Sequence, residues 1–271
     1  MTEDIDLEAY FARIGYGGPR TPTLETLRAL HELHPAAIAF ENLDTLLGRR
    51  VRLDMASVQR KLLGEKRGGY CFEQNGLFAQ VLRTLGFSVA GLSARVVFGY
   101  PPELIRRSHM LLKIDLEEGT YIADVGFGGR APSAPMWLDA CEEQTTPHGG
   151  FRLARAGDFF EQQTRIEGAW QTIYRFSLEE QSRQDYEMAN WYVCTHPDSE
   201  FRVRLMVARL PPGKRLGLLN NQFSIHHMDG TSERRTLESA AAIAEVLETE
   251  FAIALPGPRE ELLQALARVI P

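Results

Sequence analysis

Cysteine is scarce in this chain, and the few cysteines argue against two common kinds of site. The 271 residues include three cysteines, at positions 71, 141 and 194, with no CxxC spacing. An odd number of widely spaced cysteines matches neither a disulfide framework nor a zinc site built on cysteine pairs. A reducing compartment suits this cysteine usage best. We therefore predict a cytoplasmic protein without a bound metal.

The chain also lacks a long apolar run and an apolar leader. No stretch approaches the roughly 18 consecutive apolar residues that a membrane-spanning helix needs. The N-terminus is acidic, with Glu3, Asp4 and Asp6, and has neither the basic nor the apolar region of a secretory signal peptide. We expect no association with a membrane.

Positive charge is not in excess. The sequence has 30 lysines and arginines against 36 aspartates and glutamates, for a formal net charge of −6. A general nucleic-acid binder carries a basic surface, so this balance argues against a nucleic-acid partner. The 44% hydrophobic and 24% charged residues are ordinary for a globular protein. At about 100–200 residues per domain, the length predicts two or three packed units.

The hydrophobic pattern changes character twice along the chain. Residues 1–86 show mostly helical spacing, with Thr21 as a predicted N-cap and Pro22 in the first turn of the second helix. Residues 87–200 change to the alternation typical of strands, and residues 201–271 mix both patterns. The sequence therefore predicts an α+β, multi-domain protein whose units are helical, then a β-barrel or sheet, then α/β.

Individual elements follow from the same patterns. We expect a third helix near residues 55–63 and a turn at 117–120. The predicted strands are 88–98, 109–116, 121–127, 151–155, 170–176, 202–210 and 222–228, and the predicted C-terminal helices lie near 237–250 and 259–269.

The segment RGGYCFEQN at residues 67–75 is the one place where a reactive side chain stands in an activating context. Its two glycines break the preceding segment, and the apolar residues that follow keep helical spacing up to Gly86. Cys71 therefore falls in the first turn of a predicted helix, where the helix dipole and the nearby Arg67 favour a thiolate. This pattern indicates a nucleophile, and a buried cysteine acting as a small apolar residue is the alternative.

A cysteine nucleophile needs a base and a group that orients the base. Of the seven histidines, His109 at the start of a predicted strand is the best placed, and Asp124 lies in the returning strand. Counting outward from the turn pairs Asp124 with Lys113, which leaves His109 on the same face but four positions away. A β-bulge or an asymmetric turn would be needed to join the two. On periodicity alone, a cross-strand ion pair between Asp124 and Lys113 is favoured.

Several motifs support one another by their order. They are RGGYCFE at 67–73, SHM at 108–110 and DVGFG at 124–128, with FENL at 40–43, NWY at 190–192 and THPDSEF at 195–201 as further matches. RGGYC is fairly specific by itself, whereas a lone histidine or DVG is not. Taken together over roughly the first 200 residues, the sequence resembles the arylamine N-acetyltransferases, and its length is typical of bacterial members.

The resemblance implies a fold and a mechanism. The fold would be an N-terminal helical bundle (1–86), a central β-barrel (87–200) and a C-terminal α/β lid (201–271) around a papain- or transglutaminase-like catalytic core. Cys71 would be the nucleophile, His109 its base and later an acid, and Asp124 the group that orients the imidazole, with Arg67 in support. Acetyl-CoA would acetylate Cys71, and an arylamine, arylhydrazine or arylhydroxylamine would then take the acetyl group in a ping-pong sequence.

Two sets of binding residues are also implied. Phe40, Val97, Phe127 and Phe201 match positions that line the acceptor pocket in the family, with plain core packing as the alternative for each. Gly126, Gly128 and Gly129 form a GxGG loop whose amides could approach the CoA pyrophosphate, although glycines after a strand are often only a turn.

Two other functions stay open at this point. One is an amide synthase or a thiol hydrolase that uses the same three residues. The other is a non-catalytic protein that binds CoA or aromatic compounds, against which the intact Cys71, His109 and Asp124 argue. The sequence sets no oligomeric state.

Overall fold

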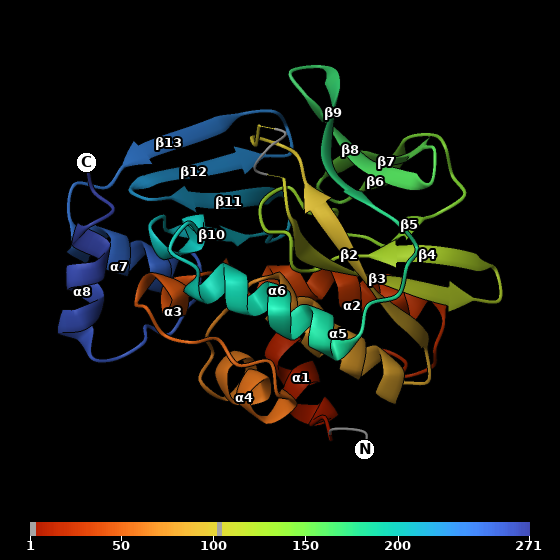
Figure 1. The fold of residues 1–271 in the computed structure, drawn as a ribbon, viewed down its shortest axis with the longest axis horizontal. Helices are drawn as coiled ribbons and strands as arrows, with labels where there is room; N and C mark the ends of the chain where they lie inside the picture. Colours follow the sequence, from red (N-terminus) through yellow and green to blue (C-terminus); the bar gives the residue numbers. More distant parts are fainter. Residues whose placement is uncertain (1–3, 102–104) are drawn as a thin grey trace.

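The structure, a computed structural model, describes residues 4–101 and 105–271. It consists of an N-terminal helical part, an eight-stranded sheet, and a five-stranded sheet with two C-terminal helices (Figure 1). This arrangement confirms the predicted α+β class. None of the helices in the described ranges has the length and apolar character that crossing a bilayer requires.

The N-terminal part of the chain is helical. Its helices are α1 (Leu7–Ile14), α2 (Leu24–Ala37), α3 (Leu43–Leu46), α4 (Met55–Gln59), the π-helix η1 (Arg60–Gly64) and α5 (Cys71–Thr84). Of these, α1, α2 and α4 begin at side-chain caps. The cap of α2 is Thr23, which accepts a hydrogen bond from the backbone N–H of Thr26 at 3.3 Å. The prediction that Thr21 caps this helix was therefore wrong. Thr23 offers the same capping oxygen directly before the first apolar position.

Helix α5 lies at the centre of the largest apolar core. Its buried residues include Leu77, Phe78, Val81 and Leu82, which pack with residues of α1, α2 and α4. The same core takes in side chains from two strands and a helix beyond residue 86, namely Met110, Leu112, Ile114, Tyr121, Ala123, Val193 and Cys194. The division at residues 86 and 200 stays a prediction, and the apolar packing is continuous across residue 86.

The eight-stranded sheet is barrel-like, with the order β5-β4-β3-β2-β9-β8-β7-β6. Its strands are β2 (Ser88–Val96), β3 (Arg107–Leu116), β4 (Gly119–Ala123), β5 (Met136–Trp137), β6 (Gln144–Thr146), β7 (Gly149–Ala156), β8 (Phe159–Ile166) and β9 (Ala169–Phe176). The side chain of Gln144 links the two edge strands, because it accepts from the backbone N–H of Trp137 at 2.8 Å and donates to its carbonyl at 3.0 Å. Strands β5, β6 and β8 were not predicted.

The hairpin of β3 and β4 has a shorter turn than the sequence suggested. Its turn is residues 117–118, and β4 already begins at Gly119. Ala123 therefore pairs with Leu112, two positions nearer the start of β3 than the predicted partner Ile114. Gly119 has φ +145°, a value that glycine adopts more readily than other residues, which permits this tighter reversal. The correction moves the end of β4 toward the start of β3.

The five-stranded sheet contains strands from both the N-terminal and the C-terminal part of the chain. Its order is β1-β10-β11-β12-β13, from β1 (Phe40–Glu41), β10 (Met206–Arg209), β11 (Lys214–Leu219), β12 (Gln222–His227) and β13 (Ser232–Thr236). Helices α7 (Ala240–Thr249) and α8 (Arg259–Ala267) share an apolar core with this sheet. The predicted strand at 202–210 is thus correct only from Met206, because a 3₁₀ turn, η3 (Glu200–Arg202), precedes it.

Helix α6 (Arg183–Thr195) was not predicted from the sequence. It begins with a capping box in which Ser182 and Asp185 bond to each other's backbone N–H. The helix crosses the front of the molecule (Figure 1) and packs against β3. It thereby covers the strand that carries His109.

Candidate active site

Cys71 is the first residue of α5, as predicted. The residue before it, Tyr70, is the extended N-cap, and the Glu73 carboxylate accepts a hydrogen bond from its backbone N–H at 3.1 Å. This bond fixes the backbone just before the thiol. Cys71 is 5% exposed, and its Sγ lies 3.7 Å from the carbonyl oxygen of Ser108. Ser108 precedes His109 in strand β3. The thiol therefore lies at the positive end of a helix dipole and faces the strand that carries His109.

His109 and Asp124 are in direct contact. Nε2 of His109 lies 2.7 Å from Oδ2 of Asp124, and both side chains are buried. The shorter turn brings the end of β4 closer to His109, and Asp124 follows the last residue of β4, Ala123. The predicted ion pair between Asp124 and Lys113 is wrong, since Lys113 pairs with Asp115 at 2.6 Å.

Every side-chain oxygen of Asp124 has partners besides the histidine. Oδ1 accepts hydrogen bonds from Asn75 Nδ2 and from the backbone N–H of Gly126, each at 3.0 Å. Oδ2 also accepts from the hydroxyl of Tyr174 at 3.0 Å. The backbone N–H of Asp124 donates to Nε2 of His31 at 3.0 Å. A buried carboxylate with this many donors is held in one position and stays ionised.

The charges of the three groups support one another. Burial disfavours the charged imidazolium, but the Asp124 carboxylate and hydrogen bonding with Asp124 and Cys71 raise the pKa of His109 to about 10. Burial also disfavours ionised Asp124, but the charge of His109 and hydrogen bonds from His109, Asn75 and Gly126 lower its pKa. Since Nε2 of His109 binds the carboxylate, Nδ1 is the nitrogen left for Cys71. This arrangement favours a protonated imidazole beside the Cys71 thiol.

Three residues that bind Asp124, namely Asn75, His31 and Tyr174, were not predicted from the sequence. Asn75 follows Cys71 by four residues, so it lies on the same face of α5, and this spacing was an available signal. Its amide also donates to the carbonyl of Met110 at 2.7 Å and accepts from Val125 N–H at 3.0 Å. His31 and Tyr174 come from α2 and β9, and no local pattern relates either to Asp124. Within the described residues, no cluster of three or more His, Cys, Asp or Glu side chains could hold a metal ion.

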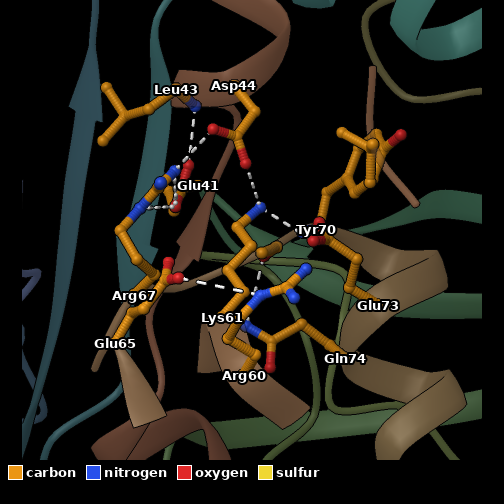
Figure 2. Close-up of polar contacts among 12 residues, drawn as sticks. Glu41, Leu43, Asp44, Arg60, Lys61, Glu65, Arg67, Tyr70, Glu73 and Gln74 are labelled. Carbon is orange, nitrogen blue, oxygen red and sulfur yellow. Dashed lines mark hydrogen bonds and ion pairs between the residues drawn. The ribbon is translucent and has the colours of Figure 1, made fainter. Parts of the chain in front are cut away.

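A buried ionic network holds the segment before Cys71 (Figure 2). Nζ of Lys61 lies 2.7 Å from both Asp44 Oδ2 and Glu73 Oε1. The guanidinium of Arg67 lies 2.9 Å from Glu41 Oε1 and 3.1 Å from Asp44 Oδ1. Figure 2 shows Asp44 between the two cations, so the network is continuous. It fixes both the loop that enters α5 and the glutamate that caps it.

This network changes the interpretation of Arg67. The sequence suggested that its charge assists the thiolate, but two carboxylates balance that charge in the structure. Its contribution is to position the loop, whose backbone approaches other groups closely. A side chain on Gly68 would collide with the carbonyl oxygen of Ala39, and one on Gly69 would place Cβ 2.7 Å from Glu73 Oε2. The two glycines of the motif are needed for this packing.

The predicted acceptor residues form two aromatic groups. The ring centroids of Phe40 and Phe201 lie 6.3 Å apart. Phe127 packs edge-on against His109 with a centroid distance of 5.0 Å. Val97 is half-buried and directly follows β2. Phe127 is therefore next to His109, and Phe40 and Phe201 form a separate aromatic pair.

A small cavity of about 60 Å³ opens at Ser108, beside Cys71. Its lining includes Ser108, whose carbonyl contacts the Cys71 thiol, together with Val96, Tyr192 and Phe201. The lining also carries the charged side chains of Arg106, Asp198 and Glu200. Cys71 and His109 are not among the lining residues, so the cavity adjoins them only through Ser108.

The GxGG loop begins inside the site. A Cβ on Gly126 would lie 2.8 Å from the Cα of Cys71, so only glycine fits there. The Gly126 N–H is already bonded to Asp124 and has no capacity left for a phosphate. Gly128 has φ +88°, a left-handed conformation that glycine adopts readily, and Gly129 lines a second cavity. The loop thus runs from the vicinity of Cys71 and Asp124 to that cavity.

Comparison with known proteins places this geometry in a family. Residues 23–259 match the family model described as N-acetyltransferase. The chain is 46% identical over 248 residues to the arylamine N-acetyltransferase of Escherichia coli (strain K12), covering 91% of this chain and 88% of that protein. The chain belongs to the arylamine N-acetyltransferase family. Members of this family are acyltransferases, so the chain is an enzyme of this class.

Other arylamine N-acetyltransferases are similar in sequence and fold. A protein of Salmonella typhimurium, an arylamine N-acetyltransferase / N-hydroxyarylamine O-acetyltransferase, is 41% identical over 96% of this chain and 92% of its own length. The Mycobacterium marinum arylamine N-acetyltransferase structure superposes with a TM-score of 0.94 at 38% identity, covering 98% of this chain and all of that one. Its structure in complex with CoA superposes equally well. The fold is therefore that of the arylamine N-acetyltransferases.

The raised pKa of His109 predicts how stability depends on pH. A histidine contributes stability that is complete below its unfolded pKa of about 6.5 and is lost as pH rises toward the folded value, here about 10. We expect the difference in unfolding free energy between the wild type and His109→Gln to fall from pH 6.5 to 10, by at most about 1.4 kcal/mol per pH unit. Urea denaturation of both proteins across this range measures it. A difference that does not change with pH would contradict the ion pair with Asp124.

The placement of Cys71 predicts selective alkylation. At pH 6, an ordinary thiol with a pKa of about 8.5 is almost wholly protonated and reacts slowly. We expect iodoacetamide to modify Cys71 faster than the exposed Cys141 or the buried Cys194, although Cys141 is the most accessible of the three. Peptide mass spectrometry over time measures the three rates. Equal rates, or faster reaction at Cys141, would refute the activated thiolate.

Proposed function

We propose that this chain transfers the acetyl group of acetyl-CoA to arylamines, arylhydrazines and arylhydroxylamines through an acetyl-cysteine at Cys71. The observation that carries the proposal is the buried contact of His109 with Asp124, beside the thiol at the start of α5. The names of the relatives support the acceptor class, and the Mycobacterium marinum complex with CoA supports the donor.

In the first half-reaction, the Cys71 thiolate attacks the thioester carbonyl carbon. The bond from that carbon to the CoA sulfur breaks, and the His109 imidazolium gives its proton to the departing CoA thiolate. Asp124 stays ionised and keeps Nδ1 of His109 directed at the reacting atoms. The products are free CoA and an acetyl-enzyme with a neutral imidazole.

In the second half-reaction, the acceptor nitrogen attacks the acetyl carbonyl carbon. His109 takes the proton from that nitrogen, and the bond from the carbonyl carbon to Cys71 Sγ breaks. The enzyme returns to the imidazolium and thiolate, and the N-acetyl product leaves. The buried site disfavours hydrolysis of the thioester while the acetyl-enzyme waits for an acceptor.

The acceptor is proposed to lie between the aromatic groups around the small cavity. Phe201, which lines the cavity, would form one wall with the neighbouring Phe40. We propose that Phe127, beside His109, and Val97, which follows β2, close the acceptor site on the other side. A flat aromatic amine would be held there by ring packing. Its nitrogen would point toward Cys71.

The proposal also covers the division of the chain into units, the role of the glycine loop and the location in the cell. We propose the three units 1–86, 87–200 and 201–271, with a papain- or transglutaminase-like core formed where the first two meet. The GxGG loop is proposed to approach the CoA pyrophosphate through Gly128 and Gly129, because the Gly126 amide is engaged. The three unpaired cysteines support a reducing, cytoplasmic location.

Isotope exchange tests the proposed sequence of steps. Without any acceptor, we expect the enzyme to exchange label between acetyl-CoA and free CoA, because the first half-reaction is complete in itself and reversible. Cys71→Ala should show no exchange. Initial rates at varied donor and acceptor concentrations should give parallel reciprocal plots. Acetyl transfer to an arylamine without exchange would show a direct transfer and overturn the acetyl-cysteine step.

A further inference from the structure

His31 is a fully buried histidine of α2 that reaches the site from the helical part of the chain. Its Nε2 lies 3.0 Å from the backbone nitrogen of Asp124. The ring of Phe78, in α5, packs edge-on against the His31 ring, with centroids 5.9 Å apart and an interplanar angle of 84°. The packing therefore fixes the orientation of the imidazole, with Nε2 directed at Asp124.

The backbone of Asp124 needs this partner because it lies beyond the sheet. The last pair of the hairpin is Leu112 with Ala123, and Asp124 is the next residue. A buried backbone N–H without an acceptor is costly, so nearly all such groups are paired in native proteins. For Asp124 the acceptor is a side chain from an element 93 residues earlier in the chain.

This hydrogen bond fixes the tautomer of His31. A backbone N–H can only donate, so Nε2 is the acceptor and the ring proton lies on Nδ1. Burial lowers the pKa of His31 to about 4, although the charge of Asp124 and the backbone of Ser133 oppose this effect. The imidazole is therefore neutral at pH 7. An imidazolium would have no lone pair for the Asp124 N–H.

His34, three residues later in α2, carries its proton on the other nitrogen. Its Nε2 lies 2.6 Å from Oε1 of Gln74, whose amide donates to the carbonyl of Ala39, and its Nδ1 lies 3.0 Å from the hydroxyl of Tyr10. The amide oxygen only accepts, so Nε2 of His34 donates and Nδ1 accepts. Burial lowers the pKa of His34 to about 3. Two buried, neutral histidines of one helix thus have opposite tautomers, and each tautomer is set by its partners.

One face of α5 connects His31 to the reacting groups. Cys71, Asn75 and Phe78 follow one another at spacings of four and three residues, which places them on the same side of the helix. Asn75 binds the Asp124 carboxylate, and Phe78 packs on His31. A shift of the Asp124 backbone would therefore move the carboxylate relative to both Cys71 and His109.

We propose that His31 is a positioning residue for the acetyl transfer, which holds the backbone of Asp124 so that its carboxylate stays aligned with His109. This inference rests on the proposed function. His31 takes no part in the chemical step. Its contribution is a neutral acceptor nitrogen at one fixed point, which an apolar ring cannot supply.

Two substitutions separate the acceptor atom from the volume of the ring. His31→Gln keeps an acceptor oxygen, and we expect its kcat to stay within about threefold of the wild type. His31→Phe keeps a ring but leaves the Asp124 N–H unpaired. We expect its kcat to fall about 30–100-fold with little change in the KM for acetyl-CoA, because a misplacement of about 1 Å can cost this much. If His31→Phe is as active as His31→Gln or more so, His31 only fills space and the proposal is wrong.

Leu262→Ala is the control for lost stability. Leu262 is fully buried in the core that α8 shares with the five-stranded sheet. This substitution leaves a cavity in that core and lowers stability. We expect its kcat to stay within about twofold of the wild type, since distant sites act independently. A loss of kcat as large as that of His31→Phe would show that instability alone explains the effect, against the proposal.

A double-mutant cycle tests whether His31 acts through Asp124. Asp124→Asn already lacks the carboxylate, so adding His31→Phe should slow the acetylation of Cys71 by less than about threefold. In the wild-type background the same substitution should cost about 30–100-fold. Equal losses in the two backgrounds would show that His31 acts independently of Asp124 and would overturn the proposal.

Nitrogen NMR of the histidines tests the positioning role without any activity measurement. In the wild type at pH 7, we expect His31 to be protonated on Nδ1 and His34, the internal reference, on Nε2. The pKa of His109 is about 10 in the wild type, and in His31→Phe its proton affinity should fall at least about tenfold. If these results hold but acetyl-CoA does not acetylate Cys71, the proposed function fails and the positioning role stands. A His31 that is charged or protonated on Nε2, or an unchanged His109 in His31→Phe, would refute that role.

Discussion

Asp124→Asn is expected to lower kcat for arylamine acetylation by about 10³–10⁴-fold, the scale of the loss when a triad histidine is held in the wrong tautomer. Oδ2 of Asp124 holds Nε2 of His109 at 2.7 Å, and its charge raises the histidine pKa. An asparagine amide cannot supply that charge, and its NH₂ group could donate to Nε2 and force the proton onto Nδ1. The base would then have no lone pair facing Cys71. Steady-state rates and the pre-steady-state acetylation rate of Cys71 measure the effect.

Asp115→Asn is the matched control for this prediction. Asp115 lies in the same hairpin, and its carboxylate binds Lys113 and Thr120 rather than His109. We expect its kcat to stay within about twofold of the wild type, since half-exposed ion pairs contribute little. A loss of less than tenfold in Asp124→Asn would show that the carboxylate does not orient the base. Equal losses in the two variants would have the same meaning.

Arg67→Met is expected to lower the free energy of unfolding by about 3–5 kcal/mol. Arg67 lies within 3.1 Å of both Glu41 and Asp44, and its side chain is 6% exposed (Figure 2). Removing the guanidinium leaves the buried Glu41 without a cationic partner, while Asp44 keeps Lys61, and the desolvation cost of the Glu41 charge is then uncompensated. Denaturant unfolding followed by fluorescence and circular dichroism measures the change. Arg67→Lys should lose less, because it keeps the charge but not the paired donors.

Arg60→Met is the control for the same segment. Arg60 lies close to the network in Figure 2, yet its pair with Glu65 is long, at 3.9 Å, and both side chains are more than half exposed. We expect a loss below about 1 kcal/mol. If Arg67→Met and Arg60→Met have similar unfolding free energies, the buried network does not hold the loop before Cys71.

Local signals were sufficient to predict that a helix begins at Cys71. Two glycines, an apolar stripe of helical spacing and a terminal Gly86 lie within 20 residues, so the start of α5 at Cys71 followed from short-range chemistry. The α+β class and five strands of the barrel-like sheet followed from alternation in the same way. These features depend on residues that are close together in the sequence, so one sequence is enough to predict them.

Predicting the contact between His109 and Asp124 depended on the length of the turn between β3 and β4. A two-residue turn at 117–118 instead of a four-residue turn moves every pair of the hairpin by two positions. Acidic residues with a following glycine are compatible with either turn, so the periodicity could not choose between them. Family resemblance supplied the contact that the register count missed.

The residues that hydrogen-bond to Asp124 from other elements could not be predicted from one sequence. Tyr174 reaches Asp124 from β9, 50 residues further along the chain, and His31 reaches it from α2, 93 residues before. Both contacts require the three-dimensional arrangement of sheet and helices. Arg67 was recognisable from its place in the motif. Its carboxylate partners lie 26 and 23 residues earlier and could not be predicted.

The measurement that tests the central claim most directly is the intact mass of the protein after mixing with acetyl-CoA. We predict one added acetyl group, located on Cys71 by peptide mass spectrometry, that disappears when an arylamine or an arylhydrazine is added. Cys71→Ala should gain no acetyl group under the same conditions, and His109→Gln should gain it far more slowly. An acetyl adduct of equal size on Cys71→Ala, or no adduct on the wild type, would contradict the account.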